Sequence, residues 1–391
     1  MKRKVCIVTS SRAEYGLLRP LLEEIANDKN LTLQLIVTGM HLSPEFGLTY
    51  REIEKDGFAV DEKIEILLSS DTPASISKSM GLAMISFSEA YGRLKSDIIV
   101  VLGDRFEFLS AVAAALISRI PVAHIAGGEV TEAAFDDSIR HSITKMSHLH
   151  FTIIEDYRKR VIQLGEDPQR VFNVGALGID NIKKLKLFSR EALEKELNFK
   201  FNKHNLLVTF HPVTLENNTS PQQFKDLLSA LENLEDTFII FTKANADPGG
   251  RIINKMIDTY VSKNCSKSAA FTSLGHLKYL SILQFVDAVV GNSSSGIVEA
   301  PSFKMGTINI GGRQKGRVEP KSIIDCQPTK ESIIKAFEKL YSKEFQRSLK
   351  KVVNPYGDGN AAKRIKNILK NYDINNILKK PFFDIDFGYR R

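Results

Sequence analysis

Short apolar runs alternate along the chain with longer segments in which apolar side chains recur every three or four residues. Residues 5–9 and 98–102 are apolar runs, which are typical of strands buried on both faces of a parallel sheet, and residues 31–37 predict a further strand. Residues 75–94 instead carry their apolar positions at helical spacing. This alternation through the first half predicts a doubly wound α/β domain.

The alternation restarts after residues 183–203, a lysine-rich stretch without a strand pattern that we interpret as a linker with a short helix. Apolar runs at residues 205–210, 237–242, 288–290 and 307–310 predict a second parallel sheet. We therefore expect two Rossmann-like domains facing one another across a cleft. The predicted parts are a first domain (1–182), a second domain (183–365) and a C-terminal segment packing back on the first domain (366–391).

Charged residues gather where the apolar runs around residues 98–150 end. One run ends at Gly-Asp-Arg and the next at Gly-Gly-Glu, and a helix with a polar stripe follows. Because sequential parallel strands place their carboxyl ends at the same sheet edge, we expect a ligand site there. Its predicted residues are Asp104, Arg105, Glu129, Asp136, Asp137, Arg140 and His141. The adjacent aspartates would also serve simply as the N-cap of the helix.

The second half carries a serine-rich strand end, Gly-Asn-Ser-Ser-Ser-Gly at residues 291–296. Small residues between a strand and a helix expose backbone N–H groups, which favours phosphate binding at Ser293 and Ser294. Glu299 is expected within that helix, and Arg313 follows the next strand. The alternative is a serine-rich N-cap without a ligand.

Two further strand ends carry a candidate side chain each. His211 follows an apolar run and precedes a proline, so it is either an acid/base or phosphate donor or an ordinary loop histidine. Arg12 follows the first strand and is either a ligand-site arginine or a solvated loop residue.

Composition excludes several classes of protein. The net charge is +8, but lysine and arginine are spread along the 391 residues without a basic run interleaved with aromatics, so we expect an anionic small ligand and no nucleic acid. The N-terminal apolar run is too short for a signal peptide or a membrane span. Three scattered cysteines imply no disulfide framework, which favours a cytoplasmic location.

Cofactor motifs are missing from the sequence. The chain has no G-x-G-x-x-G after its first strand, no Walker lysine loop and no metal-ligand spacing. We therefore expect no cofactor and no metal.

The motifs together resemble one family, the hydrolysing UDP-N-acetylglucosamine 2-epimerases of the bacterial sialic-acid branch, which are similar to the epimerase half of the human bifunctional enzyme. The matching stretches run from residue 7 to about residue 317 and read TSSRAEYG, VTGMH, GDRFE, HIAGGE, DDSIRHSITKMSHLHF, HPVT, GNSSSGIVEAP and GGRQKGR. The resemblance implies a glycosyltransferase-B-like fold, a homodimer or homotetramer and metal-free chemistry. The implied reaction eliminates UDP to give a 2-acetamidoglucal, and water then adds to give free N-acetylmannosamine.

The resemblance also implies roles for the candidate residues. It places Arg12, Arg105 and Arg313 in the nucleotide site, Ser293 and Ser294 on the diphosphate, and Glu299 on the ribose. His211 matches an active-site histidine. The carboxylates of Asp104, Glu129, Asp136 and Asp137 are expected to transfer protons and bind the sugar, with Arg140 and His141 also contacting substrate.

One departure bears on the substrate. Many members of the branch read HIEGGE, whereas this chain has Ala126 at the acidic position. A GDP-linked N-acetylglucosamine or a UDP-linked 2,4-diacetamido-6-deoxy sugar therefore stays open beside UDP-N-acetylglucosamine. A glycosyltransferase with the same diphosphate site and a nucleotide-sugar-binding regulator are the other two alternatives.

Overall fold

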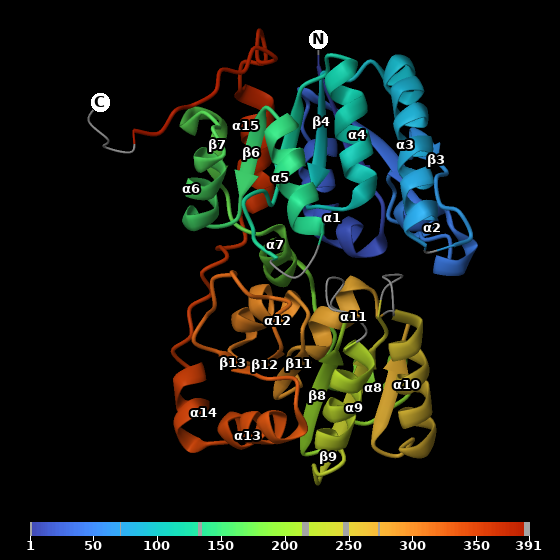
Figure 1. Ribbon diagram of the computed structural model, residues 1–391, viewed down its shortest axis with the longest axis vertical. Coiled ribbons are helices and arrows are strands. Elements are labelled where there is room, and N and C mark those ends of the chain that lie inside the picture. Colours follow the sequence, from blue (N-terminus) through green and yellow to red (C-terminus); the bar gives the residue numbers. More distant parts are fainter. Residues whose placement is uncertain are drawn as a thin grey trace. The chain divides into compact units, whose positions relative to one another are not determined.

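The computed structural model describes residues 2–70, 72–131, 135–212, 219–244, 250–272 and 274–386 (Figure 1). The chain divides into two compact units. Unit 1 comprises Met1–Glu129, Asp136–Asn181 and Tyr356–Arg391, and unit 2 comprises Val130–Phe135 and Ile182–Pro355.

Unit 1 is built on a seven-stranded parallel sheet with the order β3-β2-β1-β4-β5-β6-β7. Its strands are β1 (Arg3–Thr9), β2 (Leu31–Thr38), β3 (Glu62–Ile64), β4 (Ile98–Leu102), β5 (Val122–Ile125), β6 (Leu149–Thr152) and β7 (Val171–Asn173). The strand order reverses beside β1, between β2 and β4, which is where doubly wound sheets bind ligands at the carboxyl edge.

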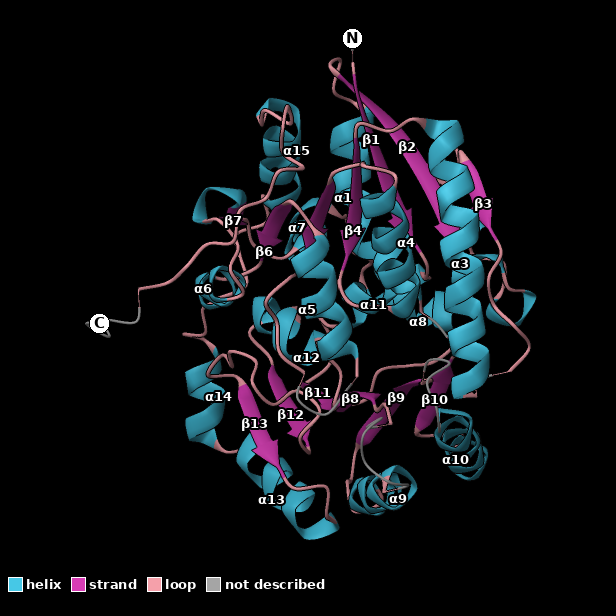
Figure 2. Cartoon of the chain, turned by 45° about the horizontal axis from the view of Figure 1, so that its top comes forward, coloured by secondary structure: helices cyan, strands magenta, loops and turns pink. Residues whose placement is uncertain are grey.

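Helices cover both faces of this sheet (Figure 2). They are α1 (Arg12–Ala26), η1 (Gly39–Leu42), η2 (Pro44–Phe46), α2 (Tyr50–Lys55), α3 (Pro73–Leu94), α4 (Phe106–Ile117), α5 (Asp136–Met146), α6 (Glu155–Gln163), η3 (Pro168–Arg170), α7 (Leu177–Lys184) and α15 (Ala361–Asn371). Val5 and Ile7 of β1 pack with α1 and α15, whereas Cys6 and Val8 pack with α3 and α4. This division follows from the alternation of side chains along a strand.

The C-terminal part of the chain belongs to unit 1. Helix α15 packs against α1, and the buried carboxylate of Asp180 accepts the first backbone N–H groups of α15, from Ala361 at 2.9 Å and from Ala362 at 2.8 Å. Asn360 stands at the N-cap of α15 but makes no side-chain capping bond, so the remote Asp180 accepts these N–H groups in its place.

Unit 2 repeats the architecture with a six-stranded parallel sheet of order β10-β9-β8-β11-β12-β13. Its strands are β8 (His204–Thr209), β9 (Thr237–Thr242), β10 (Ser268–Phe271), β11 (Ala288–Gly291), β12 (Gly306–Ile310) and β13 (Ile323–Cys326). Its helices are α8 (Arg190–Leu197), α9 (Ser220–Leu231), α10 (Gly250–Lys263), α11 (Gly275–Ile282), α12 (Ser295–Val298), η4 (Ala300–Phe303), α13 (Lys330–Leu340) and α14 (Lys343–Leu349).

The predicted fold class, two parallel-sheet α/β domains, is confirmed. The stretch 183–203, interpreted as a linker with a short helix, contains α8, which buries Leu193 completely among the apolar side chains of unit 2. The chain passes from unit 1 to unit 2 within α7, after Asn181, and returns to unit 1 at Tyr356. In the described part of the chain, no helix combines the length and apolar composition needed to cross a bilayer.

Candidate active site

The carboxyl ends of β4 and β5 lie side by side in unit 1. Leu102 and Ile125 are paired in the ladder, so Asp104 and Glu129 leave the sheet at the same edge. A close approach follows in the loop after β5, because a Cβ on Gly128 (φ 82°) would lie 2.4 Å from the carbonyl oxygen of Tyr157. Only glycine fits there, and it brings the loop against α6.

Arg140 of α5 joins three of the predicted residues. Its side chain is 3% exposed and pairs with the carboxylate of Asp104 and, at 3.2 Å, with that of Asp137. Its Nη1 also donates to the backbone carbonyl of Glu129 at 2.9 Å. Burial alone would lower the pKa of Arg140, but the carboxylates of Asp104, Glu129 and Asp137 raise it. The guanidinium therefore stays charged and holds the acids around it.

His141 lies one residue further along α5 and faces the same aspartate. Its Nε2 is 3.4 Å from Oδ2 of Asp137. Burial lowers the pKa of His141 although Asp137 opposes this shift, so the ring is neutral at pH 7. Its buried Nδ1 has no hydrogen-bond partner among the described residues. Asp137 is thus shared between a cation and a neutral imidazole.

His124 is a buried histidine beside these residues that the sequence analysis did not single out. It is fully buried on β5, and its Nε2 lies 2.8 Å from the carbonyl oxygen of Gly103, directly before Asp104. Since a carbonyl only accepts, Nε2 carries the proton, and Nδ1 lies 3.0 Å from the Thr144 hydroxyl oxygen of α5. Burial lowers the pKa of His124 to about 3. A neutral ring thus ties the Asp104 loop to α5.

Arg105 is already engaged by carboxylates within unit 1. Its Nη2 donates to Glu107 at 2.7 Å, and its Nε lies 3.3 Å from Glu14. Burial raises the pKa of Glu14 to about 7, although Arg105 opposes this rise. Neither glutamate received a role from the sequence, yet both stand within the matching stretches, TSSRAEYG and GDRFE. Glu14 and Glu107 therefore hold the side chain of Arg105, the predicted nucleotide-site arginine, in one orientation.

Arg12 and Asp136 each begin a helix, α1 and α5 respectively. Nη1 of Arg12 pairs with Glu52 at 3.1 Å, and its side chain is 25% exposed. Its buried Nη2 has no hydrogen-bond partner among the described residues, so Arg12 keeps a donor for a ligand.

Ala126, where the resemblance departs, has a φ of 65°. This left-handed conformation is uncommon for a residue with a Cβ. Its amide donates to the carbonyl of Phe151 at 2.9 Å, so β6 holds the strand end in this conformation. A methyl group is all that the side chain contributes at this edge.

Asn292 organises the strand ends of unit 2. Its side chain exchanges two hydrogen bonds with the backbone of His211, accepting from N at 2.7 Å and donating to O at 2.8 Å. Its own carbonyl accepts from Nη1 of Arg313 at 3.0 Å and from Nε2 of Gln314 at 2.8 Å. The predicted residues His211 and Arg313 are therefore brought to one place by a buried asparagine that the sequence analysis did not single out.

The helix after the serines is shorter than expected. Helix α12 spans only Ser295–Val298, so Glu299 is its C-cap and does not lie within the helix as predicted. Ser293 and Ser294 precede it, both half-buried, and the Ser295 hydroxyl accepts from Tyr279 at 2.6 Å. Because α12 is so short, its helix dipole is small. A phosphate at this strand end would therefore be bound mainly by serine hydroxyls and backbone N–H groups.

The predicted residues thus form two groups, one in each unit. Asp104, Glu129, Asp137, Arg140 and His141 share contacts in unit 1, and His211 and Arg313 are joined through Asn292 in unit 2. Val213 and Thr214 of the HPVT stretch lie outside the described residues. Among the residues that the structure describes, no group of three or more His, Cys, Asp or Glu side chains could hold a metal ion.

A comparison of the sequence with known protein families shows to which family the chain belongs. The family described as UDP-N-acetylglucosamine 2-epimerase matches residues 23–370. The chain belongs to this epimerase family.

Curated relatives of this family member cover almost the whole chain. It is 51% identical to the GDP/UDP-N,N'-diacetylbacillosamine 2-epimerase (hydrolyzing) of Campylobacter jejuni, over 98% of this chain and 100% of the relative. It is 38% identical to the polysialic acid biosynthesis protein P7 of Escherichia coli, over 98% of each chain. It is 34% identical to the UDP-N,N'-diacetylbacillosamine 2-epimerase (hydrolyzing) of Legionella pneumophila, over 97% of this chain and 99% of the relative.

The fold has solved counterparts. The UDP-GlcNAc 2-epimerase of Neisseria meningitidis bound to UDP-GlcNAc superposes with a TM-score of 0.82 at 19% identity, covering 94% of this chain and 100% of that structure. This likeness confirms the two-domain α/β architecture of the epimerase.

Proposed function

We propose that this epimerase is a hydrolysing enzyme that acts on nucleotide-linked N,N'-diacetylbacillosamine. The observation that carries the proposal is the 51% identity, over 98% of the chain, to a relative named for that activity. The Legionella relative, 34% identical, is named for the UDP-linked form. The sequence resemblance alone favours UDP-N-acetylglucosamine, whereas these relatives favour the diacetamido sugar.

The proposed reaction has two stages. A base removes the proton at C2, the C1–O bond to the diphosphate breaks, and a C1–C2 double bond forms as the nucleoside diphosphate leaves. The oxygen of a water molecule then adds to C1. C2 receives a proton on the face opposite to the one that lost its proton, which inverts C2. The products are the free 2-epimer and the nucleoside diphosphate.

The carboxylates of unit 1 suit the proton transfers. Asp104 and Asp137 both contact buried Arg140, which keeps acceptor oxygens at the carboxyl edge of the sheet. A base needs such a fixed position to meet the C2 proton. We assign C2 deprotonation and reprotonation to these two acids, with Glu129, Asp136 and His141 contacting the sugar.

The strand ends of unit 2 suit the leaving group. Ser293 and Ser294 directly follow Asn292, and Arg313 donates to its carbonyl. These residues offer hydroxyl, amide and guanidinium donors. Developing negative charge on a departing diphosphate is stabilised by donors positioned in advance. We assign the diphosphate to these residues, with Arg12 and Arg105 of unit 1 as further cations and His211 as a donor.

UDP-N-acetylglucosamine is the second candidate substrate. A further relative, 33% identical over 88% of this chain and 88% of the relative, is the UDP-N-acetylglucosamine 2-epimerase of Neisseria meningitidis. The two candidates share the reaction and differ at C4 and C6 of the sugar.

A panel of four substrates tests the proposal: diacetylbacillosamine and N-acetylglucosamine, each linked to UDP and to GDP. The protein is incubated with each one in the absence of an acceptor, and products are identified by NMR. We expect free 2-epimer and nucleoside diphosphate, with the highest kcat/KM for a diacetylbacillosamine donor. No turnover of any donor without an acceptor would contradict the proposal and favour a glycosyltransferase.

A further inference from the structure

The chain after α15 crosses unit 1 beside the C-terminal end of α5. Arg170 holds this segment by donating to the backbone carbonyls of Ile377 at 2.9 Å and Lys379 at 3.2 Å. The amide of Phe383 donates to the carbonyl of Gly165 at 2.9 Å. The segment is therefore fixed on both sides of Lys380.

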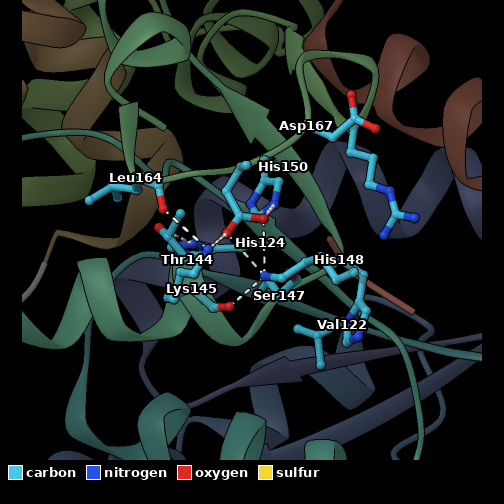
Figure 3. Close-up of polar contacts among 12 residues, drawn as sticks. Val122, His124, Thr144, Lys145, Ser147, His148, His150, Leu164 and Asp167 are labelled. Atoms are coloured by element: carbon cyan, nitrogen blue, oxygen red, sulfur yellow. Dashed lines mark hydrogen bonds and ion pairs between the residues drawn. The ribbon is translucent and has the colours of Figure 1, made fainter. Parts of the chain in front are cut away.

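The ammonium group of Lys380 reaches into a buried polar cluster that includes Glu166. Lys145, Ser147 and His150, which surround this cluster, lie close together in Figure 3. It donates to the backbone carbonyl of Lys145, to that of Ser147 at 2.7 Å and to the Glu166 carboxylate at 3.0 Å. An ammonium group has three N–H donors, so these three acceptors satisfy it. The Lys380 side chain is 14% exposed, which makes the contact nearly dry.

Two of these acceptors lie at the C-terminal end of α5, where helix carbonyls lack intrahelical partners. Nearby, the Ser147 hydroxyl donates to the carbonyl of Ile143 at 2.8 Å, and the Ser147 amide donates to that of Thr144 at 3.1 Å. Lys380 takes the carbonyls of Lys145 and Ser147. A cation in this place also complements the helix dipole.

Glu166 completes the cluster from the loop after α6. Its side chain is fully buried, and it accepts from Nε2 of His150 and from Nζ of Lys145, each at 2.9 Å. A buried carboxylate needs such partners to stay ionised. Glu166 thus links the C-terminal segment, α5 and β6 through one charged group.

The aromatic ring of Phe382 adds a further contact between the C-terminal segment and this cluster. A Cβ on Gly165 (φ 85°) would lie 2.4 Å from the ring of Phe382, so the ring packs directly on the glycine backbone. Nζ of Lys145 lies 4.5 Å from the centre of the same ring. The last turn of α5 is therefore held by the C-terminal segment through both polar and aromatic contacts.

We propose that Lys380 is a positioning residue: it fixes the C-terminal end of α5 and thereby the place of Asp137, Arg140 and His141 at the other end. The inference rests on the proposed function, because those residues are assigned to the sugar. A helix moves as a rigid body, so a shift at its C-terminal end also displaces its first turns. Such a shift would disturb the contacts of Thr144 with His124 and of Arg140 with Asp104. Lys380 itself does not contact the substrate.

The test replaces Lys380 by methionine, which keeps the apolar stem and removes the ammonium group. Lys379→Met is the matched control, because Lys379 is exposed and its loss changes the net charge equally. Lys380→Arg is the conservative variant. Amide hydrogen exchange of residues 143–148, kcat and KM are measured for each protein.

We expect Lys380→Met to exchange faster at residues 143–148 and to lose about tenfold in kcat with KM changed little, as a small misplacement of catalytic groups does. Lys380→Arg should regain part of the loss, and Lys379→Met should behave as the wild type. Unchanged exchange, or equal kcat losses in the Met variants, would overturn the inference. If the wild type turns over none of the four donors, the proposed function fails, and exchange alone decides whether Lys380 holds α5.

Discussion

The buried guanidinium of Arg140 determines where the acids of unit 1 lie. It contacts Asp104 from the end of β4 and Asp137 from the first turn of α5. Removing one partner of such a buried group leaves charge uncompensated, which is costly. The arrangement therefore serves the fold as well as the proposed chemistry, and the two roles need separate measurements.

Asp104→Asn and Asp137→Asn are each expected to lower kcat by at least about 10²-fold, because a general base is lost while the shape is retained. Nucleoside diphosphate affinity should change far less, since neither acid is among the residues that we propose for the diphosphate. Steady-state kinetics and calorimetry measure the two effects. Asp156→Asn, an exposed acid in the first turn of α6, is the control. Wild-type kcat in both site variants would remove these acids from the mechanism.

Arg313→Ala is expected to weaken nucleoside diphosphate binding by about 1.5–3 kcal/mol, the range for a charge-assisted hydrogen bond. Calorimetry with UDP and GDP measures the change. The exposed Arg347→Ala of α14 is the control, because it removes the same charge from unit 2. If both variants bind equally well, Arg313 has no part in the diphosphate site.

At the scale of elements, α5 is fixed at both ends, by Arg140 and by the cluster around Glu166. Burial would raise the pKa of Glu166, but the hydrogen bonds from His150 and Lys145 and the charge of Lys380 lower it to about 2. A carboxyl whose pKa is lowered on folding stabilises the protein above its unfolded pKa, near 4.5. That stability is lost as the pH falls from there toward 2.

Glu166→Gln tests this contribution. The free energy of unfolding of the wild type should exceed that of the variant by a constant amount above about pH 5.5, and the difference should shrink as the pH falls below the unfolded pKa. Urea unfolding between pH 3 and pH 7 measures it. A difference independent of pH would show that the Glu166 charge does not stabilise the fold.

Elements with strong local patterns were predictable from sequence. The apolar run at residues 98–102 is strand β4, and the helix expected near Asp136 is α5. The partly alternating apolar residues at 60–68 predict a longer strand than β3 (Glu62–Ile64), which is short because it lies at the sheet edge and pairs with β2 alone among the described strands. Local pattern cannot show how many partners a strand will have.

Candidate site residues that directly follow a strand could be predicted from sequence. Buried residues that hold those loops in place could not. Asp104 and Arg313 follow apolar runs, and this position is why the sequence predicts them as site residues. His124 and Asn292 hold these loops from inside, and only their tertiary contacts reveal that role. Glu166 stands in a charged stretch that looks like a solvated surface, yet it is fully buried.

At the scale of the whole molecule, each unit presents its predicted residues at the carboxyl edge of its own sheet. The acids belong to unit 1, and the serines and Arg313 belong to unit 2. The proposed reaction needs both sets, because a proton leaves C2 while a diphosphate leaves C1. Elimination followed by hydration is thus the central claim about how the whole chain works.

Turnover in D₂O tests that claim most directly. Because rehydration takes the C2 proton from a solvent-exchanged acid, we predict that the free sugar product carries deuterium at C2. Proton NMR and mass spectrometry of the product measure this incorporation, with the unreacted nucleotide sugar from the same reaction as the internal reference. A free sugar that keeps its original C2 hydrogen would contradict the elimination route.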